Sequence, residues 1–111
     1  MINELNAYLE AIKIDYRKWS TYRDGSISQS ILDAAIVRFE AGLKVVETQL
    51  YYKVIKEGSG VHSFIVKEDG LKFKKGDILK AATFKAPAKN QARGNLFTGY
   101  RIRWTGAEYL R

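Results

Sequence analysis

Apolar residues recur at helical spacing along the first forty positions of the chain. In residues 3–22 they lie three or four apart on one face of a predicted helix, namely Leu5, Tyr8, Leu9, Ile12, Tyr16 and Trp19. A second stripe predicts a helix over residues 27–43, formed by Leu32, Ala35, Ile36, Phe39 and Leu43. Ser26 and Gln29 match a capping box at its start, and Gly42 favours a left-handed stop at its end.

After residue 44 the pattern changes to the alternation and the β-branched and aromatic content of strands. Strands are expected over residues 45–56, 61–67, 71–73, 78–84 and 96–105. Gly58-Ser59-Gly60 supplies the turn of a hairpin between the first two, because glycine readily adopts positive φ. In the last strand, Arg101 and Arg103 alternate with aromatic and aliphatic residues, so the arginines should face outward.

These elements predict one α+β domain spanning residues 1–111. Its N-terminal helical hairpin would pack on a mainly antiparallel sheet, arranged as a meander or a partly closed barrel. No helix longer than about three turns should follow residue 46. The longest loop should cover residues 85–95, which have no apolar period.

Composition narrows the classes of protein that the chain can belong to. The chain has no cysteine, which excludes disulfides, thiolate nucleophiles and thiolate metal sites. It has no apolar run of the roughly 20 residues that a membrane-spanning helix needs. We therefore expect a cytoplasmic protein without membrane contact.

Charge is distributed unevenly along the chain. Residues 1–50 carry six basic and seven acidic side chains, whereas residues 51–111 carry thirteen basic and five acidic ones. The halves thus have formal charges of −1 and +8. Such a field attracts polyanions, for example nucleic acid or an acidic protein surface, although it would also serve solubility alone.

Candidate catalytic residues are few. His62 is the only histidine and stands next to Ser63, but neighbours in a strand point to opposite faces and should not touch. The acidic residues show no D-x-D spacing that suits a divalent cation. We expect no cofactor, no metal site and no enzymatic activity, and a structural or surface role for His62.

The strongest functional signal is the run of basic residues between positions 72 and 103. The candidate nucleic-acid-binding residues are Lys85, Lys89, Asn90, Arg93, Arg101 and Arg103. Because the loop leads into the strand that carries both arginines, these side chains could converge at one edge of the sheet. Phe84 and Phe97 are the aromatic rings expected to be exposed for stacking. The alternatives are a protein-binding adaptor that uses the β-half, and a solvated sheet face with a mobile loop.

Four stretches of the C-terminal half resemble small uncharacterised proteins encoded by tailed bacteriophages. They are residues 62–66 (HSFIV), 75–82 (KGDILKAA), 86–90 (APAKN) and 92–95 (ARGN). The resemblance implies a phage origin and action in the host cytoplasm, and it transfers no activity and no functional residue. For such a protein we expect either a nucleic-acid-associated accessory factor or an adaptor for a host or phage protein.

Overall fold

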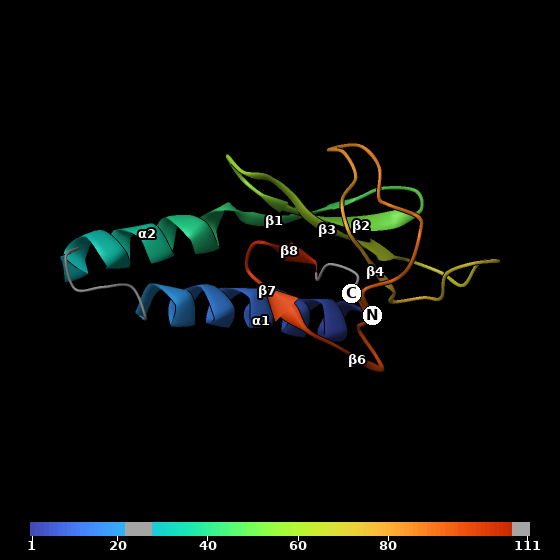
Figure 1. The fold of residues 1–111 in the computed structure, drawn as a ribbon, viewed down its shortest axis with the longest axis horizontal. Coiled ribbons are helices and arrows are strands. Elements are labelled where there is room, and N and C mark those ends of the chain that lie inside the picture. Colours follow the sequence, from blue (N-terminus) through green and yellow to red (C-terminus); the bar gives the residue numbers. More distant parts are fainter. Residues whose placement is uncertain (22–27, 108–111) are drawn as a thin grey trace.

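The computed structural model describes residues 1–21 and 28–107 and has an α+β fold (Figure 1). Helices α1 (Ile2–Thr21) and α2 (Gln29–Gly42) form the N-terminal hairpin. An open antiparallel sheet follows in the order β1 (Leu43–Glu47), β2 (Tyr51–Lys56), β3 (Gly60–Val66) and β4 (Ile78–Leu79). Two separate hairpins complete the fold. They are β5 (Gly94–Asn95) with β6 (Gly99–Tyr100), and β7 (Ile102–Arg103) with β8 (Gly106–Ala107). The predicted class, helical hairpin and antiparallel meander are confirmed.

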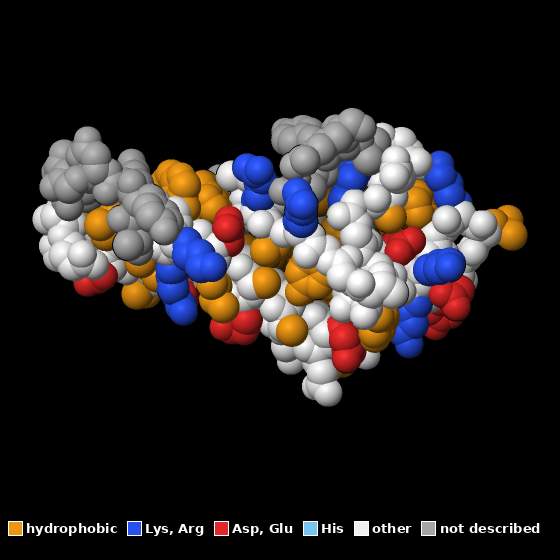
Figure 2. All heavy atoms as spheres, turned by 60° about the horizontal axis from the view of Figure 1, so that its bottom comes forward, with side chains coloured by type: hydrophobic (Ala, Val, Ile, Leu, Met, Phe, Trp, Pro, Cys, Tyr) orange, Lys and Arg blue, Asp and Glu red, His pale blue; other side chains and the backbone are white. Residues whose placement is uncertain are grey.

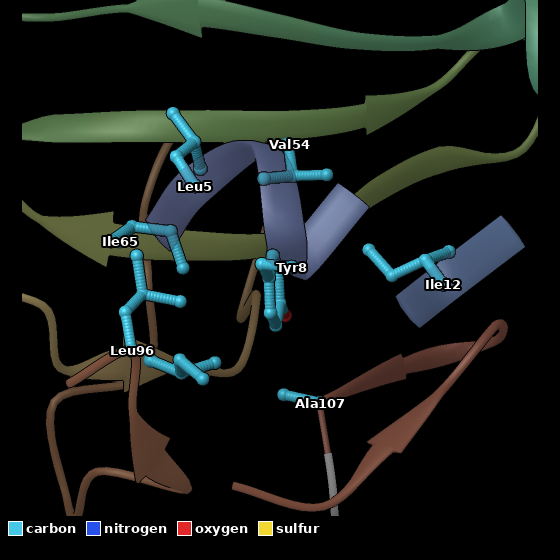
Figure 3. Packing of buried hydrophobic residues seen from close by; sticks show 8 residues of the cluster. Leu5, Tyr8, Ile12, Val54, Ile65, Leu96 and Ala107 are labelled. Carbon is cyan, nitrogen blue, oxygen red and sulfur yellow. The ribbon is translucent and has the colours of Figure 1, made fainter. Parts of the chain in front are cut away.

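The N-terminal half of α1 packs on one face of the sheet, which we call the helix face. Leu5, Tyr8 and Ile12 recur three and four residues apart and are buried. They meet Val54 and Ile65, which point toward the helix from β2 and β3 (Figure 3). Burial of such side chains contributes about 1.5–3 kcal/mol each, so this contact is a main source of stability.

The C-terminal half of α1 extends beyond the sheet and is held by aromatic contacts. The ring of Tyr16 stacks on that of Phe39 from α2, with centroids 4.1 Å apart. Trp104 contacts Tyr16 edge-on at 5.0 Å and Trp19 at 4.9 Å. This cluster joins the helical hairpin to the C-terminal strands, and it explains the aromatic residues on the predicted inner face of α1.

Helix α2 lies at the periphery and has no buried residue among those described. Ile31 and Val37 are exposed, and hydrophobic side chains reach the surface along the hairpin at the left of Figure 2. Gly42 does not have a positive φ, and Leu43 is already extended, so α2 passes directly into β1. The predicted left-handed stop is therefore wrong. The capping box falls partly on Ser26, which lies outside the described residues.

The expected strand over residues 45–56 is two strands joined by a turn. The Thr48 hydroxyl accepts a hydrogen bond from the backbone N–H of Tyr51, and the Thr48 N–H donates to the Tyr51 carbonyl at 2.8 Å. These bonds reverse the chain, so that β1 pairs with β2. By contrast, the glycine turn between β2 and β3 is as predicted, with φ of 82° at Gly58 and 97° at Gly60.

Residues 71–73 do not form a strand, and the strand expected over 78–84 ends at Leu79. Side-chain carboxylates reshape the first segment: Asp69 accepts from the Lys75 N–H, and Asp77 accepts from the Lys74 N–H. After Leu79 the chain leaves β3 and turns back on itself. The Ala88 N–H donates a hydrogen bond to the Lys80 carbonyl, which holds the two arms of this turn together.

The strand expected over residues 96–105 is also interrupted. The Asn95 Oδ1 accepts from the N–H groups of Phe97 at 2.7 Å and Thr98 at 3.3 Å, which bends the chain between β5 and β6. The Asn95 Nδ2 donates to the Lys75 carbonyl and to Asp77. The alternation from position 100 is nevertheless correct, since Arg101 and Arg103 are exposed while Tyr100, Ile102 and Trp104 are partly buried in the helix-face core. The sequence predicts a short packed tail over residues 106–111; its first two residues form β8, and residues 108–111 lie outside the described part.

Replacement of Asn95 by alanine is expected to lower the free energy of unfolding by about 2 kcal/mol, because several backbone groups lose their partner. Asn90→Ala is the matched control, since Asn90 is exposed and bonds only within its own loop. Its cost should stay within about 0.5 kcal/mol. Urea unfolding of both variants measures the difference, and equal stabilities would contradict the structural role of Asn95.

Candidate nucleic-acid interface

The sheet has a second buried face, opposite to α1, which we call the loop face. Phe64 and Val66 of β3 and Leu79 of β4 point to it and form a separate buried cluster. Irregular chain covers this cluster, with Phe73, Ala81 and Ala92 packed against it. In Figure 1 the orange segment of residues 80–93 rises over the sheet on the side away from α1. The longest predicted loop thus covers the second face of the sheet.

Within this segment, residues 81–87 form a tight loop with an ordered tip. The backbone of Ala81 bridges to that of Pro87, and Thr83 N–H donates to the Ala86 carbonyl at 3.0 Å. The Thr83 hydroxyl accepts from the N–H groups of Lys85 and Ala86, at 3.2 and 3.1 Å. Phe84 and Lys85 therefore stand at the tip of a loop whose backbone is fixed by its own hydrogen bonds, including one from the Ala82 N–H to the Ala86 carbonyl.

Phe84 is 57% exposed, although one face of its ring is covered. The Nζ atom of Lys53, from β2, lies 3.8 Å from the centroid of this ring and 5.8 Å from that of Phe64. Lys53 is only 9% exposed, and no described carboxylate forms an ion pair with it. Aromatic faces stabilise such a cation through their quadrupole. The exposure of Phe84 confirms the sequence-based expectation for this ring.

The other loop-face cations lie along the same covering segments. Lys72 Nζ donates to the Lys89 carbonyl, which brings the preceding loop beside residues 80–93. The Arg93 guanidinium donates to the Asn90 side chain at 3.1 Å and to the Gln91 carbonyl at 3.2 Å. Residues 78–107 contain no aspartate or glutamate. We call Lys53, Lys72, Phe84, Lys85, Lys89 and Arg93 together the basic loop surface.

Arg101 and Arg103 lie elsewhere. Their neighbours Tyr100 and Ile102 pack in the helix-face core, whereas Ala92 packs in the loop-face cluster. The chain changes faces at β5, which contacts β4 at the edge of the sheet. The segment that carries Lys85, Lys89, Asn90 and Arg93 therefore lies over the loop face of the sheet. Arg101 and Arg103 are separated from it.

His62 and Ser63 form a buried polar network that was not expected. Val54 faces Ser63 and Ile55 faces Val61, so the register shifts and His62 is an extra residue in a bulge. His62 Nε2–H donates to the Arg103 carbonyl at 2.7 Å, because a carbonyl can only accept. His62 Nδ1 then accepts from the Ser63 hydroxyl at 2.8 Å, and Ser63 accepts from Tyr8 at 2.7 Å. The prediction that His62 and Ser63 do not touch is wrong.

Burial controls the titration of this network. It lowers the pKa of His62 to about 4, and the positive charge of Lys56 acts in the same direction. The Arg103 carbonyl and Asp15 act against this shift. Burial also raises the pKa of Tyr8 far above its ordinary value. Within the described residues, all three members of the network are therefore neutral hydrogen-bonding groups near pH 7.

His62 also lines a cavity of about 110 Å³ beside Lys80 and Thr105, and the described lining contains no carboxylate and no serine. Across the part of the chain that the structure covers, no three potential metal-ligating side chains cluster together. None of the described helices has the length and apolar character to span a membrane.

Comparison of the chain with protein-family models, with curated proteins and with solved structures finds no match. These comparisons assign the chain to no family, and the resemblance to phage proteins stays a prediction.

Proposed function

We propose that the protein binds nucleic acid through the basic loop surface, by contacts to the phosphate backbone and without strong sequence preference. The observation that carries the proposal is the absence of acidic residues from positions 78–107, combined with the placement of residues 80–93 across the loop face. Lysines supply mobile point charges for phosphates, and Arg93 supplies a planar fork. In a phage-encoded protein this binding would take place in the host cytoplasm.

The proposal predicts a steep dependence of affinity on salt. Four phosphate contacts from Lys72, Lys85, Lys89 and Arg93 would make log affinity for a single strand fall with log salt at a slope of roughly −3. The Lys85→Ala, Lys89→Ala double variant should bind more weakly to every sequence, with a slope reduced by about 1.4. Titration of labelled single-stranded DNA, duplex DNA and RNA at several salt concentrations measures both quantities.

The matched control removes two positive charges from the helical hairpin. Lys18 and Arg38 are exposed on α1 and α2, so the Lys18→Ala, Arg38→Ala variant has the same net charge as the loop variant. Its affinity and salt slope should stay close to those of the wild type. Equal losses of affinity in the two double variants would mean that binding depends only on the net charge of the protein and not on the basic loop surface. Undetectable binding at low salt would refute the proposal.

A second candidate function rests on a groove at the far end of the sheet. The groove has a volume of about 410 Å³ and is lined by Tyr51, Val66 and Phe73. Leu50 and Leu71 also line it and are exposed, beside the charged residues Lys67, Glu68, Asp69 and Lys72. Exposed apolar side chains bordered by polar ones are typical of protein-binding sites. This feature favours an adaptor that binds an apolar segment of another protein through the β-half. Such binding would show a nearly flat response to salt.

A further inference from the structure

We infer that Phe84 and Lys85 form a subsite for one unpaired base and its phosphate, which makes the protein selective for single-stranded nucleic acid over duplex. This inference rests on the proposed function and specifies its ligand. The base would stack on the open face of Phe84, and Lys85 would contact the adjoining phosphate. A stacked ring and a neighbouring cation are the pair of contacts that one nucleotide requires.

The Phe84 ring is prepared for such a contact. Lys53 Nζ lies 3.8 Å from the ring centroid on one face, and the 57% exposure of the residue leaves other parts of the ring open to solvent. The ring stands on the loop that is fixed through the Thr83 hydroxyl and the Ala81 to Pro87 bridge. Because the loop is already ordered, stacking would cost little conformational entropy.

The surroundings of Phe84 select a base over an apolar side chain. The next residue is Lys85, the cation beneath the ring is Lys53, and residues 78–107 contribute no acidic side chain. An apolar partner would leave these charges without a counterion, whereas a nucleotide brings a phosphate together with its π-face. In a duplex the faces of the bases are already stacked on each other, so only single strands offer them along their length.

Phe97 provides an internal comparison. It is similarly exposed, at 50%, but it stands in the turn between β5 and β6. It lies against Gly76, where an added Cβ would come within 2.7 Å of the ring. No described cation stacks on it. Phe97 therefore serves as a matched control for the loss of an exposed aromatic ring outside the proposed subsite.

The experiment compares Phe84→Leu with Phe97→Leu in binding to three ligands. These are an oligothymidylate, an oligomer of abasic sites with the same number of phosphates, and a duplex of the same length. Phe84→Leu should weaken binding to the oligothymidylate by roughly 5- to 150-fold, the range that corresponds to the loss of one aromatic stack. It should leave binding to the abasic oligomer unchanged, Phe97→Leu should change neither, and Phe84→Trp should restore affinity.

Three results would overturn the subsite. The first is unchanged binding of Phe84→Leu to the oligothymidylate, and the second is an equal loss of its affinity for the abasic oligomer. The third is a Phe84→Trp variant that unfolds at the same midpoint as the wild type and yet does not restore affinity. If the Lys85→Ala, Lys89→Ala variant loses affinity for all ligands while Phe84→Leu does not, the subsite is wrong and the proposed function stands. If the wild type binds none of the ligands at low salt, both are refuted.

Discussion

Replacement of Tyr8 by alanine is expected to lower the free energy of unfolding by about 4 kcal/mol, a large share of the roughly 5–15 kcal/mol that stabilises an ordinary domain. Tyr8 is fully buried between α1 and the sheet, and its ring contacts those of His62 and Tyr100 at 5.9 and 5.2 Å. The substitution leaves a cavity the size of the ring. It also removes the hydroxyl that donates to Ser63, so that a buried acceptor loses its partner.

Tyr8→Phe separates the two contributions. It keeps the ring and removes only the hydroxyl, so it should cost about 1–2 kcal/mol. Urea unfolding followed by circular dichroism gives both values, with Ile14→Ala as the control because Ile14 is exposed on the same helix. If Tyr8→Ala were no more destabilising than Ile14→Ala, the packing of α1 on the sheet would be wrong.

Acidification is expected to destabilise the protein by roughly 3 kcal/mol between pH 6.5 and pH 4, through His62 alone. Burial lowers the pKa of His62 to about 4, while the unfolded chain keeps the ordinary value of 6.5. Within this range the unfolded state binds the proton and the folded state does not, so stability is complete above pH 6.5 and falls as the pH decreases. Below about pH 4 both states are protonated and this contribution stops changing.

The His62→Gln variant isolates this effect, because glutamine can donate to the Arg103 carbonyl but cannot take up a proton. Between pH 6.5 and pH 4 its free energy of unfolding should fall by about 3 kcal/mol less than that of the wild type. Glu4 and Glu57, whose pKa values are lowered by the N-terminal amine and by Lys44, are common to both proteins. Parallel pH profiles for the two proteins would contradict the burial of His62.

The helices were predictable because the spacing of apolar residues that indicates a helix is a local pattern in the sequence. The spacing of Leu5, Tyr8 and Ile12 identifies the buried face of α1 without reference to the rest of the chain. The glycine turn between β2 and β3 was predictable for the same reason, since Gly58 adopts the positive φ that glycine allows.

The strand ends were less predictable because side chains compete with the sheet for backbone hydrogen bonds. Thr48, Asp69 and Asn95 each bind backbone N–H groups and turn the chain within segments that have the composition of strands. The bulge at His62 likewise depends on pairing with β2 and on the carbonyl of Arg103, forty-one residues away in the chain. No local pattern contains that information.

The candidate site was predictable in part. The basic loop and the exposure of Phe84 follow from the sequence, whereas the position of Arg101 depends on where the chain crosses the edge of the sheet. Lys53 was missed because it is an isolated charge in an apolar strand. In the structure both faces of β3 are covered, because Ile65 packs in the helix-face core whereas Phe64 and Val66 pack in the loop-face cluster. Lys53 points to the second of these faces.

The direct passage of α2 into β1 has a mechanical consequence. The two elements follow one another along the length of the molecule without an intervening turn (Figure 1). A load applied to the hairpin along this direction acts parallel to β1, and it strains the five residue pairs between β1 and β2 together. The edge strand would therefore resist such a load in shear, through all five pairs at once.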